Sequence, residues 1–233
     1  MSEMVKYVEK EIDGEIYLIK TKEWAEKQEE ALYESRFART GLPIHVRNLV
    51  LKDYIGTNRS IPRKLTKYVE EFDTRYRNIH LYFWSHDNGT QKTTMASIVG
   101  NLLLKKGFST RFILMGDLLT LLTDLNKGED SSERRQDLLD CDFLIIDDSF
   151  DKKKATIFRS GYQISFLDIF LRDRLERLRK ATCFTSNFSI DEIDEEVFGV
   201  SLKKLVKRSV PDPFEFSVLY SDRNDFDINT LWS

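Results

Sequence analysis

The sequence predicts an α/β fold with a mainly parallel sheet flanked by helices. From residue 79 onward, short apolar runs of strand length alternate with helical patterns, an order typical of parallel sheets with helical crossovers. A polar loop containing Gly89 joins the first of these runs to a helix near Lys92. A later apolar run, residues 143–146, ends directly in two aspartates. The last two observations place polar, chemistry-bearing residues at strand ends, where parallel sheets bind ligands.

Composition supports one globular body. The chain has 233 residues, of which 41% are hydrophobic and 12% aromatic, enough apolar material for a single α/β core. Its apolar runs fall far short of the ~20 residues that a membrane-spanning helix needs. The N-terminus lacks the apolar stretch of a signal peptide, and Cys141 and Cys183 each adjoin an apolar run. We therefore expect a cytoplasmic protein with two buried thiols and no membrane partner.

The acidic excess lies in the first fifth of the chain. Residues 1–40 hold seven basic and ten acidic side chains, whereas the remaining 193 residues hold 29 of each. Within this segment, residues 15–20 alternate as a short strand and residues 21–40 form an amphipathic helical pattern, which Gly41-Leu42-Pro43 ends. We expect two domains: a small, mostly helical segment, residues 1–40, and an α/β domain, residues 41–233.

The elements of the larger domain follow from apolar runs and helix signals. A helix should begin near Ile61-Pro62, since proline suits the first helical turn. Five strands are expected at residues 79–84, 110–115, 143–146, 182–185 and 214–220. Helices are expected at residues 93–105, 118–125, 133–139, 164–179 and 190–198. The fourth helix ends in a leucine and arginine pattern that predicts core-facing leucines and a basic outer face, with Arg172, Arg174, Arg177 and Arg179.

Residues 79–94 have the order of a phosphate-binding loop. A strand leads into the loop HDNGTQKTT, residues 86–94, and a helix follows. In such loops backbone N–H groups and a helix N-terminus hold phosphates, a lysine binds the β- and γ-phosphates, and a hydroxyl binds Mg²⁺. Lys92 fits the lysine and Thr93 the hydroxyl. The expected nucleotide contacts are Asn88, Gly89, Thr90, Gln91, Lys92, Thr93 and Thr94.

The aspartates after residues 143–146 supply a second element at the expected place. In a nucleotide site, Asp147 would hold Mg²⁺ through water and Asp148 would polarise the attacking water. Each element alone also fits a plain structure, namely a polar turn capped by Thr93 or Thr94, or two acids that cap a helix. Together they favour a site for ATP and Mg²⁺. A third element, Ser186-Asn187 after strand 182–185, can orient the water against the γ-phosphate.

These segments resemble a known group. Residues 81–94, residues 144–149 and, most closely, the segment KATCFTSNF (residues 180–188) resemble the DnaC/DnaI helicase-loader and IstB transposition-helper group of AAA+ ATPases. The resemblance covers Gly41 to Arg223, about three quarters of the chain. It implies an AAA+ P-loop ATPase fold with a five-stranded sheet, Asn187 as sensor 1 and Arg223 as the sensor-2 residue. It also implies an arginine finger within residues 203–208, with Arg208 as the best candidate, although a solvated basic helix face fits Arg208 as well.

The P-loop departs from the motif. His86 and Gln91 stand where the motif has glycines. A side chain at position 91 is expected to crowd the phosphates or to oppose a positive φ. The predicted ATPase therefore has a degenerate Walker A loop, and hydrolysis depends on how the loop accommodates these side chains.

The resemblance implies a bacterial or phage DNA replication protein that docks on a replicative helicase through residues 1–40. Its AAA+ ATPase domain, residues 41–233, is then expected to bind single-stranded DNA and to form homo-oligomers. Candidate DNA-binding residues are Lys152, Lys153, Lys154 and Arg159, with Phe158 and Tyr162 interleaved; the same residues also fit a solvated loop.

Three alternatives remain open. One is an IstB-like transposition helper, which a preference for duplex DNA would distinguish. Another is a non-hydrolysing adaptor with a decayed P-loop, raised by Gln91. A small nucleotide kinase is disfavoured by the Thr-Ser-Asn strand end.

Overall fold

The computed structural model describes residues 6–13, 15–54, 56, 58–123, 129–151 and 161–218. The chain divides into two compact units, Met1–Thr40 and Gly41–Ser233. Each unit has its own secondary structure, and each is considered by itself.

The N-terminal unit contains a β-hairpin and a helix. Strands β1 (Tyr7–Ile12) and β2 (Glu15–Lys20) pair antiparallel, and helix α1 (Lys22–Ala38) follows. Thr21 caps α1 by accepting a hydrogen bond from the Trp24 backbone N–H. The second strand and the helix match the sequence expectation, but β1 was not expected, because Glu9, Lys10 and Glu11 interrupt its apolar alternation.

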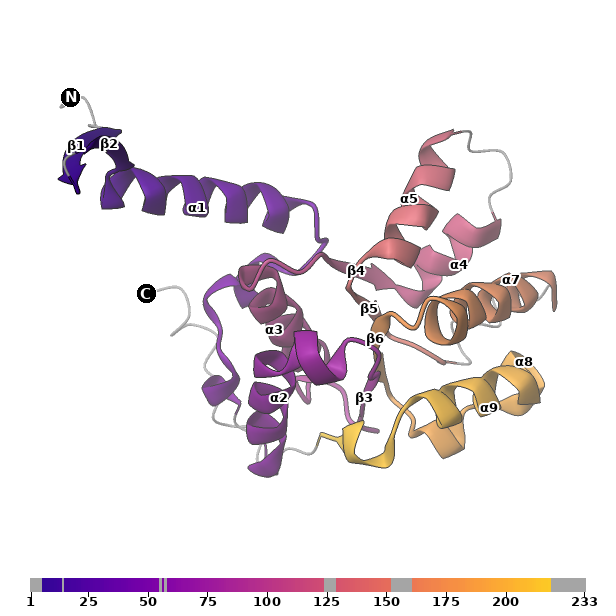
Figure 1. Cartoon of the computed structure of the whole chain (residues 1–233). Helices are drawn as coiled ribbons and strands as arrows, with labels where there is room; N and C mark the ends of the chain where they lie inside the picture. Colours follow the sequence, from indigo (N-terminus) through magenta and orange to yellow (C-terminus); the bar gives the residue numbers. More distant parts are fainter. Residues whose placement is uncertain are drawn as a thin grey trace. The chain divides into compact units, whose positions relative to one another are not determined.

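The larger unit is built on a five-stranded parallel sheet, as predicted (Figure 1). Its strands are β3 (Leu81–Trp84), β4 (Thr110–Leu114), β5 (Phe143–Asp147), β6 (Ala181–Ser186) and β7 (Glu215–Ser217). Their order in the sheet is β4-β5-β6-β3-β7, and every neighbouring pair is parallel. Strand β6 thus lies between β5 and β3, so the carboxyl ends of these three strands lie side by side.

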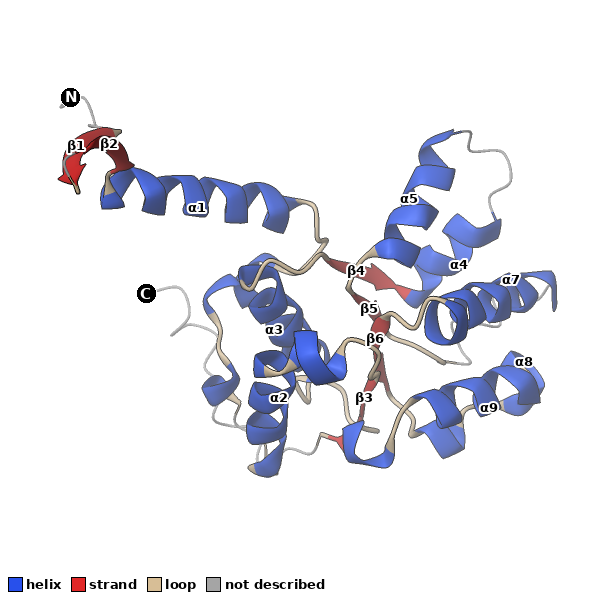
Figure 2. Ribbon diagram, in the orientation of Figure 1, coloured by secondary structure: helices blue, strands red, loops and turns tan. Residues whose placement is uncertain are grey.

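Helices cover both faces of the sheet (Figure 2). Helices α2 and α3 lie on one face, and α4, α5, α7 and α9 on the other. The α-helices of this unit are α2 (Ser60–Glu70), α3 (Lys92–Lys105), α4 (Met115–Thr123), α5 (Glu129–Asp140), α7 (Gly161–Arg172), α8 (Glu195–Phe198) and α9 (Val200–Ser209). Short 3-10 or π turns are η1 (Ile44–Asn48), η2 (Leu51–Asp53), η3 (Phe72–Tyr76), η5 (Asp173–Arg177), η6 (Ile190–Glu192) and η7 (Asp212–Phe214).

Alternation along the strands divides the core between the two faces. Tyr82, Ile146 and Phe184 belong to the buried cluster formed with α4, α5, α7 and α9. Side chains at the intervening positions, such as Asp147 and Thr185, point to the opposite face. Helix α3 packs on that opposite face. The first turn of α3 and the end of β5 are therefore on the same side of the sheet.

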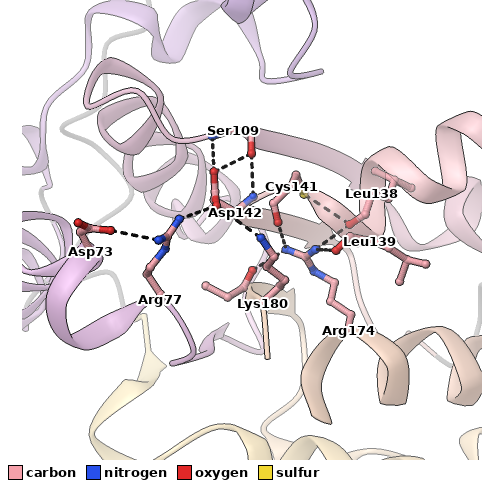
Figure 3. A network of polar contacts seen from close by, with 10 residues as sticks. Asp73, Arg77, Ser109, Leu138, Leu139, Cys141, Asp142, Arg174 and Lys180 are labelled. Carbon is pink, nitrogen blue, oxygen red and sulfur yellow. Dashed lines mark hydrogen bonds and ion pairs between the residues drawn. The ribbon is translucent and has the colours of Figure 1, made fainter. Parts of the chain in front are cut away.

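Arg174 contradicts the expected basic outer face. It is fully buried, on the same helical face as Leu171 and Leu175. Its guanidinium donates to the carbonyl oxygens of Leu138, Leu139 and Cys141 (Figure 3). It also donates to the carbonyl oxygen of Ala181 and to the Thr182 hydroxyl. The expectation that Arg174 faces solvent is wrong, because five acceptors compensate its burial. Arg177 and Arg179 are exposed as expected.

Both cysteines, Cys141 and Cys183, are free and buried. Across the part of the chain that the structure describes, no helix is long and apolar enough to cross a membrane.

Candidate nucleotide site

The predicted P-loop connects β3 to α3. After Trp84 the chain turns through residues 85–91, and α3 begins at Lys92. Two residues of the loop have left-handed backbone conformations, Gly89 with φ of 76° and Gln91 with φ of 63°. The side chain of Gln91 does not prevent the positive φ, contrary to expectation. A non-glycine residue in this region costs roughly 1–2 kcal/mol, so the surrounding loop holds position 91 in a strained conformation.

The Lys92 ammonium faces the loop. Its side chain is buried, with 8% relative exposure. Lys92 Nζ donates to the carbonyl oxygens of Ser85 at 3.2 Å and Asp87 at 2.9 Å, and to Thr90 Oγ1 at 3.3 Å. Burial lowers the pKa of Lys92, while the carboxylates of Asp148, Asp147 and Asp87 oppose that shift. These oxygen partners are the kind that phosphate oxygens can replace.

The P-loop and the β5 carboxylate meet directly. Thr93 Oγ1, in the first turn of α3, donates to Asp147 Oδ1 at 2.7 Å. Asp147 ends β5 and is 5% exposed. Burial raises the pKa of the Asp147 carboxyl, and hydrogen bonds from Thr185 and Thr93 oppose that rise. The sequence prediction that Thr93 and Asp147 belong to one site therefore has direct geometric support.

The donors at this point suit Mg²⁺. A hydroxyl and a carboxylate are hard oxygen ligands, and Mg²⁺ commonly takes only one or two carboxylates and completes its shell with water and phosphate oxygens. Among the described residues, no group of three or more His, Cys, Asp or Glu side chains could hold a metal ion. The Thr93 and Asp147 pair thus fits a cation that is shared with a nucleotide.

Asp148 lies in a strained turn after β5. Its φ is 53°, and its backbone N–H donates to Thr185 Oγ1 at 3.1 Å. The next amide, Ser149 N–H, donates to the carbonyl oxygen of Thr185 at 2.7 Å. The turn therefore holds the second acid beside the carboxyl end of β6.

Thr185 is a site residue that sequence analysis missed. Its hydroxyl also donates to Asp147 Oδ1, so that one carboxylate oxygen accepts from Thr93 and Thr185. The signal was a threonine near the end of a predicted strand, two positions before Asn187. This signal could not identify Thr185 as a site residue, because the order of strands in the sheet, which the sequence does not give, places β6 next to β5.

Asn187 follows β6 at the same edge of the sheet. The Phe188 N–H donates to Ser186 Oγ at 3.1 Å, which fixes a tight turn around the half-buried Asn187. Because β6 lies between β3 and β5, this turn follows the strand between the P-loop strand and the acidic strand.

The other predicted residues lie in the P-loop region, near the end of α9, or outside the described residues. Arg208 is near the end of α9, exposed, and forms an ion pair with Glu176. Asn88 is exposed and Thr94 half-buried. Lys152, Lys153, Lys154, Arg159 and Arg223 fall outside the part of the chain that the structure describes.

His86 contacts the segment that follows β6. Its Nε2 lies 3.5 Å from Glu192 Oε1, and its ring meets the Trp84 ring edge-on at 5.3 Å between centroids. The side chain that replaces the first glycine of the motif therefore points toward η6.

Known proteins are similar to this chain in sequence over about half of its length and in fold. No protein-family model matches the sequence. The chain is similar to the replicative helicase loader DnaC of Escherichia coli (strain K12) and to that of Shigella flexneri, each with 32% identity over 130 residues. The alignment covers 53% of this chain and 51% of each relative. The chain thus spans about half the length of the curated relatives it matches.

Solved structures show the same fold. A crystal structure of DnaI has a TM-score of 0.60 at 16% identity and covers 79% of this chain and 95% of that one. A DnaC helicase loader has a TM-score of 0.57 at 19% identity, with 76% of this chain and all of that chain (100%) covered. AMPPCP-bound DnaA from Aquifex aeolicus has a TM-score of 0.56 at 20% identity, covering 76% of this chain and 51% of that one. The chain therefore has the AAA+ P-loop ATPase fold and is, in sequence and structure, similar to the DnaC/DnaI helicase loaders, as its motifs indicate.

Proposed function

We propose that this protein is an ATPase that loads a replicative helicase onto single-stranded DNA in the bacterial cytoplasm. The observation that carries the nucleotide part is the 2.7 Å hydrogen bond between Thr93 and Asp147, residues 54 positions apart. It brings the first helical turn after the P-loop to the acidic strand end, which is the arrangement that an NTP site needs. The loading part rests on the similarity to the helicase loaders named above.

Within the proposed site, each residue has a separate task. Lys92 exchanges its loop oxygens for the β- and γ-phosphates, and Thr93 and Asp147 hold Mg²⁺, which neutralises phosphate charge when bound. Asp148 orients and polarises the attacking water, and Asn187 positions it against the γ-phosphate. Arg208 and Arg223 are proposed to complete the site, Arg208 from a neighbouring copy of the chain.

The proposed partners use other parts of the chain. The N-terminal unit docks on the helicase; apolar side chains of its hairpin are exposed, with Ile16 at 71% and Leu18 at 69%. Lys152, Lys153, Lys154 and Arg159 are proposed to contact the DNA backbone. Copies of the chain assemble so that one supplies Arg208 to the next.

A second candidate function is a non-hydrolysing adaptor. It is favoured by Gln91, whose side chain stands in the strained, left-handed position of the P-loop. An IstB-like transposition helper has the same site, and a preference for duplex over single-stranded DNA distinguishes it from the loader.

Titration with AMPPCP and steady-state ATP turnover test the nucleotide part. We expect the wild type to bind AMPPCP, and Lys92→Ala to lower turnover at least about 100-fold, because an electrostatic partner of the phosphates is lost. Gln91→Gly relieves the strained φ and should bind AMPPCP at least as tightly as the wild type. If the wild type neither binds nor hydrolyses ATP at millimolar concentration, the ATPase proposal fails and the adaptor stands.

A binding assay with purified replicative helicase tests the loading part. The full chain should retain the helicase, and a chain that starts at Gly41 should not. Retention that is equal with and without residues 1–40 would rule out the N-terminal unit as the docking segment.

A further inference from the structure

We infer that Thr185 is a positioning residue that sets both carboxylates of the nucleotide site at once. The inference rests on the proposed function, since it assigns Thr185 a role toward Mg²⁺ and nucleotide at that same site. No motif residue has this role: Thr185 belongs to β6, and it acts through Asp147 and Asp148.

Thr185 contacts three successive residues at the end of β5. Its hydroxyl donates to Asp147 Oδ1 and accepts from the Asp148 N–H at 3.1 Å. Its carbonyl oxygen accepts from the Ser149 N–H at 2.7 Å. The hydroxyl thus acts as donor to the first acid and as acceptor for the backbone of the second, which uses both hydrogen-bonding capacities of a hydroxyl.

The contact with Asp147 fixes the rotation of its carboxylate. Thr93 Oγ1 and Thr185 Oγ1 donate to the same atom, Asp147 Oδ1. They approach from different elements, α3 and β6, which lie on and beside β5. A carboxylate held by two donors from two elements has little freedom to turn, so its other oxygen keeps one direction.

The contacts with Asp148 and Ser149 hold a strained turn. Asp148 has φ of 53° and Phe150 has φ of 62°, a conformation that non-glycine residues seldom adopt. Such strain persists only where surrounding bonds fix the backbone. Thr185 accepts hydrogen bonds from the backbone N–H groups of both Asp148 and Ser149. It therefore sets the direction in which the Asp148 side chain points.

Water is a poor substitute for this hydroxyl. Thr185 is 1% exposed and Asp147 is 5% exposed. Removal of the hydroxyl would leave a buried carboxylate and a buried amide each with one partner fewer, and hydrogen bonds to charged groups are stronger than those between neutral groups. Valine has the shape of threonine without the hydroxyl, and serine keeps the hydroxyl without the methyl group, so these two variants separate chemistry from packing.

The test compares the wild type with Thr185→Val, Thr185→Ser and Thr110→Val. Thr110 is a buried threonine in β4 whose hydroxyl donates to the Gly100 carbonyl oxygen at 3.1 Å, so Thr110→Val is a matched loss of a buried hydroxyl outside the site. For each protein the dissociation constant for AMPPCP is measured by calorimetry, once with Mg²⁺ and once with EDTA. ATP turnover and the melting temperature are measured on the same samples.

We expect Thr185→Val to weaken AMPPCP binding about tenfold or more with Mg²⁺ and less than about twofold with EDTA. Its kcat should fall at least about tenfold, because the Asp148 carboxylate is no longer held in the orientation that polarises the attacking water. Thr185→Ser should restore the Mg²⁺ dependence to within about threefold of the wild type. Thr110→Val should keep the wild-type ratio between the two conditions, even if its melting temperature falls.

Other outcomes overturn the inference in distinct ways. Equal losses with Mg²⁺ and with EDTA in Thr185→Val would make Thr185 a packing residue only, and a wild-type Mg²⁺ dependence would exclude any role toward the site. In both cases the proposed ATPase stands, because the wild type binds AMPPCP and turns over ATP. A wild type that does not bind AMPPCP under either condition overturns the proposed function and the inference together.

Discussion

His80 is a buried histidine at the start of the P-loop strand. It is 3% exposed, and its Nδ1 accepts a hydrogen bond from the Thr182 N–H at 3.2 Å. Burial, then the positive charges of Arg174 and Arg179, lower the pKa of His80 from 6.5 to about 3. The folded protein therefore keeps this imidazole neutral, with Nδ1 as acceptor, far below the pH at which an exposed histidine takes up a proton.

The difference between the His80 pKa in the folded chain and in the unfolded chain predicts that the protein loses stability in mild acid. As the pH falls below about 6.5, the unfolded chain protonates His80 but the folded chain does not, until the pH nears 3. The free energy of unfolding then decreases by up to about 1.4 kcal/mol per pH unit, or about 2 kcal/mol at pH 5. Urea unfolding between pH 8 and pH 5 measures it, and His80→Gln should lack this part of the pH dependence. His45→Gln, at an exposed position, is the control; equal slopes in wild type and His80→Gln would contradict the prediction.

At the scale of single residues, the sequence analysis could predict the residues of the candidate nucleotide site whose chemical type suits phosphate or Mg²⁺ binding. Lys92, Thr93 and Asp147 follow from the spacing of a loop, a helix and an acidic strand end. The structure joins Thr93 to Asp147 by a hydrogen bond, and Lys92 precedes Thr93 in the first turn of α3. Thr185 could not be found this way, because a threonine is common in strands and its role depends on which strand lies beside β5. The backbone conformation of Gln91 could not be predicted either, because non-glycine residues seldom adopt the positive φ of 63° that the loop imposes there.

At the scale of elements, Arg174 joins the end of α5 to the start of β6. The carbonyl oxygens of Leu138 and Leu139 are in the last turn of α5, where helix carbonyls lack partners within the helix. A guanidinium there also favours the negative end of the helix dipole. Beside it, Asp142 accepts hydrogen bonds from the Ser109 N–H and hydroxyl and forms an ion pair with Arg77 (Figure 3). Burial disfavours the Asp142 charge, but the Ser109 and Arg77 contacts outweigh it and lower the pKa of that carboxyl.

Replacing Arg174 should destabilise the whole larger unit. Arg174→Met keeps a long apolar side chain but leaves four carbonyl oxygens and one hydroxyl without this donor. We expect the free energy of unfolding to fall by about 3–5 kcal/mol. Arg177→Met, which removes only an exposed ion pair with Asp173, should cost less than about 1 kcal/mol. Chemical unfolding of both variants measures the difference, and similar losses in the two would show that burial of the guanidinium is unimportant.

Element types were predictable from the sequence where a periodic pattern was long or fully apolar. The five strands of the sheet and helices α2, α3 and α7 were expected near their observed positions. Strand β1 and the separate helix α9 were not, because charges interrupt the apolar pattern in both. The prediction for Arg174 was wrong for another reason. Its spacing from Leu171 and Leu175 indicates the core face of the helix, but its charge led to the prediction that it faces solvent.

At the scale of the whole molecule, strand order decides which residues share a site. Local patterns predict strands but not their neighbours, since crossovers set the order. The observed order places β6 between β3 and β5. Thr185, in β6, and Asn187, directly after it, therefore lie between the strand that leads to the P-loop and the strand that ends in Asp147. Arg208 is a different case. It pairs with Glu176 in its own chain, and a finger role would require release from Glu176 and insertion into the site of another copy.

Mixed assemblies test that role. Arg208→Ala should bind AMPPCP like the wild type but lose about 10³-fold in turnover, the usual effect of removing an arginine finger. Lys92→Ala should be inactive because its own site fails, yet it still carries Arg208. If neighbours associate head to tail, an equal mixture of the two variants should regain about a quarter of wild-type turnover, since one in four interfaces joins an intact site to an intact arginine.

The control for this experiment is Lys207→Ala, which removes the adjacent basic side chain and its exposed contact with Asp191 and should keep full turnover. Glu176→Ala frees Arg208 from its partner in the same chain and should leave turnover equal to or above the wild-type rate, because the guanidinium no longer has to leave an ion pair. A mixture that stays inactive, while each variant still assembles to the wild-type size in light scattering, would remove Arg208 from the shared site. Full activity of Arg208→Ala alone would do the same and would direct the search for a finger to two further lysines of α9, Lys203 and Lys204.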